Sequence, residues 1–167
     1  MNQLKETIKN IKLIVLDVDG VLTDGSLFYS KDGEHIKRFN VRDGQGIKLA
    51  QAYDIEAAII SGRECEIVKN RFSELGIKHI YQHCHDKAKK IKELTNELKI
   101  SLNETAYIGD DILDVPVLEI VGLPTCPKDA HPSVVSKSKL ITESYGGHGC
   151  VRELIDLILK EQGKVPA

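Results

Sequence analysis

The chain has 167 residues, 41% of them hydrophobic and 29% charged, which suits one compact domain with a hydrophobic core. With a formal net charge of -2, 5% aromatic residues and no tryptophan, it lacks the basic face and stacking platform typical of nucleic-acid-binding proteins. The first ten residues, MNQLKETIKN, are polar and helix-like. No apolar run approaches the roughly 20 residues that a membrane span needs. The four cysteines are widely spaced. We therefore expect a cytoplasmic protein with reduced thiols and with neither a nucleic-acid nor a membrane partner.

Short apolar runs alternate with longer amphipathic stretches along the chain. The apolar runs, each short enough for a strand, cover residues 11–17, 55–61, 77–82, 105–110, 121–126 and 139–142. Helical periodicity covers residues 44–53, 64–75, 86–98, 112–119, about 129–135, and 148–162. Strands that alternate with helices predict a parallel sheet covered by helices on both faces, a Rossmann-like three-layer α/β/α fold.

One segment interrupts this alternation directly after the first strand. Residues 26–41 contain two β-like runs around Asp32 and Gly33, a pair typical of a hairpin turn. We expect a small β-hairpin flap at this point. The sequence contains no internal repeat or linker, so we expect a single domain over residues 1–167. A glycine-rich stretch begins the last part of the chain, and we expect a flexible C-terminal segment over about 144–167.

Acidic residues follow two of the predicted strands. VLDVDG places Asp17 and Asp19 after the first strand, and IGDDILD places Asp110, Asp111 and Asp114 after another. Ligands of an open parallel sheet bind outside the carboxyl ends of its strands, so we expect the two acidic groups at one edge. Such crowded charges repel one another unless a cation lies among them, and oxygen ligands alone favour Mg²⁺.

Two further strand ends supply groups that complement the acids. Ser61, in the segment ISGR, offers a hydroxyl and nearby backbone N–H groups at a helix start, which suit a phosphate oxygen. Lys87 begins the helix after the third main strand, where its ammonium could neutralise a phosphoryl group. A carboxylate nucleophile, a metal ion and a cationic contact to the phosphate together predict phosphoryl transfer.

The segments around Asp17, Ser61, Lys87 and Asp110 resemble the four motifs of the haloacid dehalogenase-like phosphohydrolases. The resemblance covers residues 10–163. In detail, the sequence is similar to the capless branch of this family, which acts on 3-deoxy-D-manno-octulosonate 8-phosphate. The segments that carry it are FNVRDGQGIKLA, SGRECEIVKNRFSELGI, GDDILDVPVLEIVGLP, DAHP and YGGHGCVRELIDLILKEQGK. It implies a Mg²⁺-dependent phosphomonoesterase of lipopolysaccharide inner-core synthesis, with a small phosphorylated sugar acid as substrate. It also implies a homotetramer whose hairpins pack together and cover each site.

The resemblance implies a role for each motif residue. Asp17 would be the nucleophile that forms an aspartyl phosphate, and Asp19 would be the general acid and base. Mg²⁺ would be held by the Asp17 carboxylate, the Asp19 backbone carbonyl and Asp110. Ser61 and Lys87 would hold the transferring phosphoryl group.

Further residues would support the site or bind the sugar. Asp111 and Asp114 would support the metal ligands or orient the lysine. Gly62, Arg63 and Arg71 lie in a segment that matches the family and would contact substrate, the two arginines through its carboxylate. His148 is a candidate substrate contact at a position where the family often has arginine, and Gln45 stands where an aromatic residue is common. These two differences leave the identity of the sugar open.

Other interpretations remain at this stage. A phosphatase for a sialic-acid-type 9-phosphate would use the same scaffold, as would a single copy of a domain otherwise fused to a sugar nucleotidyltransferase. A receiver-like phosphoaspartate signalling module also uses acids, a hydroxyl and a lysine around Mg²⁺, but it lacks a second aspartate two residues after the nucleophile. We expect Asp24 to be a turn residue, and we assign no metal to residues 83–86.

Overall fold

The computed structural model describes residues 2–164, apart from the side chains of Asn2, Glu34 and His35. Its centre is a six-stranded sheet in the order β5-β4-β1-β6-β7-β8, in which every pairing is parallel. The strands are β1 (Leu13–Leu16), β4 (Glu56–Ile60), β5 (His79–Tyr81), β6 (Thr105–Ile108), β7 (Leu123–Cys126) and β8 (Leu140–Ile141). The chain runs outward from β1 through β4 and β5 and then returns to β6 on the other side of β1, which creates a switch point beside β1.

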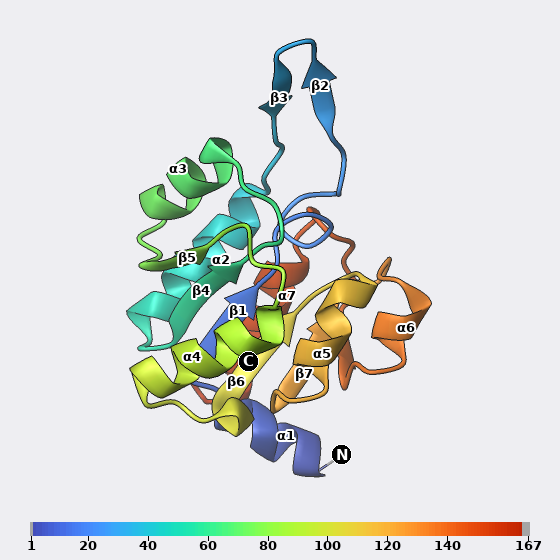
Figure 1. Ribbon diagram of the computed structural model, residues 1–167. Helices are drawn as coiled ribbons and strands as arrows, with labels where there is room; N and C mark the ends of the chain where they lie inside the picture. The colour runs from blue at the N-terminus through green and yellow to red at the C-terminus, as the bar shows by residue number, and fades with distance from the viewer. Residues whose placement is uncertain (1, 165–167) are drawn as a thin grey trace.

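Helices cover both faces of this sheet (Figure 1). One core includes side chains of α1 (Asn2–Lys9), α2 (Val41–Ala52), α3 (Glu66–Glu74) and α7 (Cys150–Glu161). The other includes side chains of α4 (Lys87–Leu98), α5 (Val115–Leu118) and α6 (Pro132–Val135). Along β1, Ile14 and Leu16 face the first core while Leu13 and Val15 face the second, as the two-residue period of a strand requires. The predicted three-layer α/β/α fold is confirmed.

Several predicted boundaries move by a few residues for local reasons. The helix expected at 44–53 begins at Val41, because the side chain of Asn40 accepts a hydrogen bond from the N–H of Arg42 and caps it. The stretch 112–119 divides into a 3-10 turn, η2 (Ile112–Asp114), and α5. A second 3-10 turn, η1 (Leu102–Glu104), was not expected.

The predicted hairpin consists of β2 (Phe28–Ser30) and β3 (Gly33–Ile36), which pair antiparallel. It projects beyond the body of the molecule at the carboxyl edge of the sheet (Figure 1). Its apolar side chains are not buried: Leu27, Phe28, Tyr29 and Ile36 are 45–65% exposed. A protruding hairpin with exposed apolar residues needs another surface to cover them.

The described part of the C-terminal segment packs against the body of the molecule, and the flexibility expected over 144–167 stays a prediction. The N–H of Gly147 donates to the carbonyl of Val21 at 2.8 Å, and a Cβ atom at Gly146 would overlap the carbonyl oxygen of Gly20. The glycines are needed here for a close approach of two backbones rather than for freedom. Residues 165–167 lie outside the described range. No helix within residues 2–164 combines the length and the apolar character that a membrane crossing requires.

Candidate active site

The carboxyl ends of four neighbouring strands carry the polar residues selected from the sequence. Asp17 follows β1, Ser61 follows β4, and Asp110 lies two residues after β6. Lys87 is the first residue of α4, the helix after β5. Because β1 lies between β4 and β6, these side chains meet at one edge of the sheet.

A cavity of about 190 Å³ lies at this edge. Most of the residues selected from the sequence line it: Asp17, Asp19, Ser61, Gly62, Arg63, Lys87, Asp110, Asp111 and Asp114. Leu113 also lines the cavity and is 71% exposed. The arrangement therefore brings a group of acids, a hydroxyl and two cations around one small space.

Lys87 is buried and pairs with two carboxylates. Its Nζ lies 2.7 Å from Oδ1 of Asp114 and 3.0 Å from Oδ1 of Asp17. Burial alone would lower the pKa of Lys87, but the charges of Asp17 and Asp114 outweigh burial and raise it. Lys87 therefore stays positively charged beside Asp17. Its neighbour Lys90 instead pairs with Glu93 on the surface of α4.

Carboxylate oxygens of Asp17, Asp110 and Asp114 lie within 4.8 Å of one another. Burial, opposed by Lys87, raises the pKa of Asp17 to about 7. Burial and the nearby Asp17 charge raise the pKa of Asp110 to about 8. Oδ1 of Asp110 is one of two buried side-chain polar atoms within residues 2–164 that have no hydrogen-bond partner. An unpaired oxygen among crowded carboxyl groups fits a hard divalent cation such as Mg²⁺.

Both oxygens of Asp114 already accept hydrogen bonds. Oδ1 accepts from Lys87 Nζ at 2.7 Å and from the hydroxyl of Tyr107 at 2.6 Å. Oδ2 accepts from the backbone N–H groups of Asp110 and Asp111 at 2.9 and 3.2 Å. Asp114 therefore positions the lysine and the acidic turn, and its oxygens are less available to a cation than Oδ1 of Asp110.

Gly20 provides the space that Asp110 occupies. Its φ of +87° lies in the left-handed region, and a Cβ atom there would overlap Oδ2 of Asp110. The loop that contains Gly20 is held by Thr23, whose Oγ1 accepts from the N–H of Gly25 at 3.2 Å. The glycine after Asp19 thus lets the two acidic segments approach each other closely.

The carboxylate of Asp19 has different partners from those of Asp17. It lies outside the Asp17–Asp110–Asp114 cluster, and its Oδ1 lies 2.5 Å from Nζ of Lys37. On its other side, Nε of Arg63 lies 3.9 Å from Oδ2. Arg63 also donates from Nη2 to the hydroxyl of Tyr29 at 3.1 Å. Asp19 thus lies between two cations, Lys37 and Arg63, and Lys37 comes from the segment where the hairpin returns to the body.

Ser61 is held in a tight turn at the end of β4. It is 3% exposed, and its Oγ accepts from the N–H of Arg63 at 3.3 Å. The backbone carbonyl of Ser61 accepts from the N–H of Cys84 at 3.0 Å. This pairing ties the Ser61 turn to the loop before Lys87 and fixes the hydroxyl at the cavity.

Two predicted substrate contacts do not line the cavity. Arg71 lies on α3, where its Nη1 is 3.6 Å from Oε2 of Glu74. His148 is exposed and bonds through Nδ1 to the carbonyl of Gly146 at 2.7 Å, while its Nε2 lies 3.1 Å from Nη2 of Arg38. Within one chain, neither side chain lines the cavity that contains Asp17 and Asp110.

Asp24 behaves as expected for a turn residue. Its Oδ1 accepts from the N–H of Ser26 at 3.0 Å, and its Oδ2 accepts from Nη2 of Arg38 at 2.7 Å. These contacts close the acidic loop at the base of the hairpin.

Three residues of the site are not among those predicted from the sequence. Tyr107 could have been found as a hydroxyl inside a buried strand, because a buried phenol needs a partner. Lys37 could have been suspected as a cation in an alternating hairpin strand, but nothing local indicated its partner. Leu113 carries no signal beyond its place in the acidic turn.

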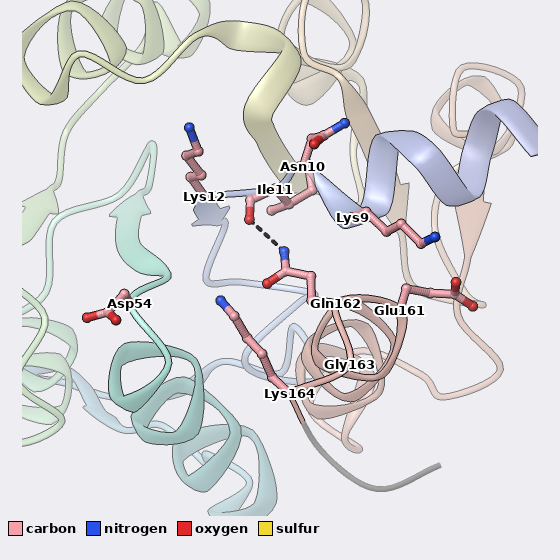
Figure 2. Close-up of a pocket in the computed structure, with 9 residues that line it drawn as sticks. All are labelled: Lys9, Asn10, Ile11, Lys12, Asp54, Glu161, Gln162, Gly163 and Lys164. Atoms are coloured by element: carbon pink, nitrogen blue, oxygen red, sulfur yellow. Dashed lines mark hydrogen bonds between the residues drawn. The ribbon is translucent and has the colours of Figure 1, made fainter.

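A larger hollow lies at the opposite edge of the sheet (Figure 2). It measures about 570 Å³ and is lined by residues near both chain ends: Lys9, Asn10, Ile11, Lys12, Asp54, Glu161, Gln162, Gly163 and Lys164. Figure 2 shows Nε2 of Gln162 directed at the carbonyl of Ile11, a bond of 2.8 Å. Nζ of Lys164 donates to the carbonyl of Tyr53 at 2.7 Å. These polar groups join the end of α7 to the body. The described residues that line this hollow form no acidic cluster like that of Asp17, Asp110 and Asp114.

Known proteins share both the sequence and the site-bearing fold. A family model for haloacid dehalogenase-like hydrolases matches residues 78–154. The 3-deoxy-D-manno-octulosonate 8-phosphate phosphatase of Escherichia coli strain K12 is 46% identical over 157 residues, which cover 94% of this chain and 84% of that protein. The chain belongs to the haloacid dehalogenase-like hydrolases and, within them, to the family of this relative.

Solved structures of the family are similar over almost the whole chain. The 3-deoxy-D-manno-octulosonate 8-phosphate phosphatase of Yersinia pestis has a TM-score of 0.95 at 43% identity and covers 98% of this chain and 88% of that one. The enzyme from Moraxella catarrhalis, in complex with magnesium ion, phosphate ion and 3-deoxy-D-manno-octulosonate (KDO), has a TM-score of 0.94 at 40% identity. That match covers 98% of this chain and 94% of that one.

Proposed function

We propose that this protein is a Mg²⁺-dependent phosphatase that hydrolyses 3-deoxy-D-manno-octulosonate 8-phosphate to the free sugar acid and phosphate. The observation that carries the proposal is the convergence of Asp17, Asp110 and Lys87 at the carboxyl edge of the sheet, in a chain of this family. The reaction supplies a sugar acid for lipopolysaccharide inner-core synthesis.

The first chemical step uses the two aspartates after β1. An Asp17 oxygen attacks phosphorus and forms an aspartyl phosphate, while the bond between phosphorus and the sugar oxygen breaks. Asp19 gives its proton to that leaving oxygen. Lys87, 3.0 Å from Asp17, and Ser61, fixed at the cavity, hold the phosphoryl oxygens during transfer.

The second step releases phosphate and restores the enzyme. Asp19, now ionised, takes a proton from a water molecule that attacks the phosphorus of the aspartyl phosphate. The Asp17–phosphorus bond breaks, inorganic phosphate leaves, and both carboxyl groups return to their starting states. The second aspartate is the feature that a receiver-like signalling module lacks, because such a module must retain its phosphate.

The Asp17 carboxylate, the Asp19 backbone carbonyl and Asp110 would hold the metal ion. Mg²⁺ bound there would neutralise the crowded carboxylates and the charge on the phosphate. Asp114 orients Lys87 through its 2.7 Å bond. Asp111 caps the acidic turn, since its Oδ1 accepts from the N–H of Ile112 at 2.7 Å.

Substrate recognition is assigned first to Arg63 and Gly62, which line the cavity. Arg63 presents a cation to the sugar carboxylate, and Gly62 presents a backbone N–H. Arg71 and His148 lie outside the cavity. We propose that they contact a part of the sugar that extends beyond this cavity, or that they contribute to the site of a neighbouring copy.

We also propose a homotetramer and a cytoplasmic location. The apolar residues of the hairpin are half exposed, and packing of hairpins from several copies would bury them. The four cysteines are free, as is usual in a reducing compartment. A single-domain organisation over residues 1–167 is part of the same proposal.

The test is phosphate release from a panel of esters with and without Mg²⁺. We expect 3-deoxy-D-manno-octulosonate 8-phosphate to be hydrolysed faster than a sialic acid 9-phosphate, and activity to vanish with a chelator. Preference for the nine-carbon ester would instead identify the sialic-acid-type phosphatase. A stable phosphoprotein without turnover would support the signalling module and end the phosphatase proposal.

A further inference from the structure

Lys37 is an almost fully buried cation that no motif predicted. Its side chain is 1% exposed, and its Nζ lies 2.5 Å from Oδ1 of Asp19. Lysine is almost never so deeply buried unless it is paired. The site therefore contains two buried lysines that each pair with an aspartate, because Lys87 lies 3.0 Å from Asp17.

The two lysines come from different parts of the fold. Lys87 lies on α4, in the body of the molecule, whereas Lys37 directly follows β3, where the hairpin returns to the body. Its neighbours Ile36 and Arg38 are exposed. This alternation is that of an extended chain, so the register of the hairpin determines that Lys37 faces inward toward Asp19.

We propose that Lys37 is a positioning residue for the reaction: its ammonium holds the Asp19 carboxylate at the leaving-group side of the cavity. This inference rests on the proposed function, since it assigns Lys37 to the group that we propose as general acid and base. Arg63 cannot replace it, because its Nε is 3.9 Å from the other Asp19 oxygen and its side chain is 39% exposed. The hairpin thus contributes directly to the geometry of catalysis.

A general acid matters most when the leaving group is a strong base. A sugar alkoxide needs a proton in the transition state, whereas p-nitrophenolate leaves readily without one. If Lys37 positions Asp19, its loss should slow hydrolysis of the sugar phosphate more than that of p-nitrophenyl phosphate. A residue that only stabilised the fold would reduce both rates by the same factor.

The experiment compares Lys37→Met with Lys31→Met, which removes an exposed lysine from the tip of the same hairpin. Both substrates are measured in each preparation with Mg²⁺ present. For Lys37→Met we expect kcat for the sugar phosphate to fall about tenfold to hundredfold, with KM changed less than about threefold. We expect kcat for p-nitrophenyl phosphate to fall less than about threefold. Lys31→Met should match the wild type.

Two further variants separate positioning from folding. Lys37→Arg keeps the charge, and we expect it to recover part of kcat for the sugar phosphate. Lys37→Met combined with Asp19→Asn should be no slower than Asp19→Asn alone, since a residue that acts through Asp19 has no effect once that acid is gone. The ratio of the two kcat values within one preparation does not depend on the folded fraction, so it remains decisive for a destabilised variant.

Equal losses on both substrates, or an additional loss in the double variant, would overturn the role of Lys37 and leave the proposed function intact. If the wild-type chain released phosphate from neither ester, the proposed function would be overturned, and this inference with it.

Discussion

The hollows at the two edges of the sheet differ in size and in kind. The hollow near the chain ends measures about 570 Å³, and the cavity at the carboxyl edge about 190 Å³. In the larger one, polar side chains complete hydrogen bonds that join α7 to the body. In the smaller one, Asp17, Lys87 and Asp114 are each at most 7% exposed. Burying charge is costly unless function or pairing compensates, so convergent buried charge marks the site better than volume does.

The sharpest test of this contrast is Asp17→Asn beside Asp54→Asn. The first removes the proposed nucleophile, and we expect kcat to fall about 10⁴-fold or more. The second changes an exposed aspartate in the larger hollow whose φ of 59° suits asparagine equally well. We expect it to leave kcat unchanged. Wild-type turnover by Asp17→Asn, measured as phosphate release, would rule out covalent catalysis.

A second contrast compares Gly20→Ala with Gly163→Ala. Both glycines have positive φ, but a Cβ at Gly20 meets Asp110, while a Cβ at Gly163 meets no atom of the described residues within 4 Å. Each variant should lose about 1–2 kcal/mol of stability through backbone strain. Only Gly20→Ala should also weaken Mg²⁺-dependent activity, by about a hundredfold, since it displaces a proposed metal ligand. Similar activity in the two variants would mean that Asp110 is not a ligand of the metal ion.

The buried acids at the carboxyl edge should also make the stability of the protein depend on pH. In the metal-free protein the pKa values of Asp17 and Asp110 rise from 3.8 to about 7 and about 8. A carboxyl group with a raised folded-state pKa contributes stability below its unfolded pKa of about 4. That contribution is lost as pH rises through about 7 to 8.

The proposed Mg²⁺ site consists of ionised carboxylates, so the effect of Mg²⁺ on stability should follow this loss. We expect the increase in Tm on adding Mg²⁺ to be larger at about pH 9 than at about pH 6. Asp54→Asn should show the same increase, and Asp110→Asn should show almost none. An increase that is equal at both pH values would separate Mg²⁺ binding from these two acids.

The smallest expected effect concerns Tyr107, whose hydroxyl donates to Asp114 at 2.6 Å. Tyr107→Phe removes one of several donors to Asp114, and we expect about 1–2 kcal/mol less stability and only a few-fold lower kcat. Tyr145→Phe changes a tyrosine that is 50% exposed and should alter neither quantity. A large loss of activity in Tyr107→Phe would mean that Lys87 and the two backbone N–H donors do not hold Asp114 in place without the tyrosine.

Sequence patterns were sufficient for the fold and for most of the cavity lining. Buried parallel strands such as β1 appear as short apolar runs, and the residues that follow them must lie at one edge of the sheet. Asp17, Ser61, Lys87 and Asp110 were therefore predictable from local sequence. Arg71 was placed near the substrate by resemblance alone, and in one chain it instead pairs with Glu74.

The sequence by itself determined the α/β fold, the acidic strand ends and their approach to one another, because these depend on local periodicity and on the parallel arrangement. Only the tertiary structure decided that Lys37 meets Asp19, that Tyr107 meets Asp114, and that Oδ1 of Asp110 has no partner among the described residues. It also decided that the glycines near 146 pack against the acidic loop. Such contacts join segments far apart in the chain, and they depend on hairpin register and loop paths that no local pattern encodes.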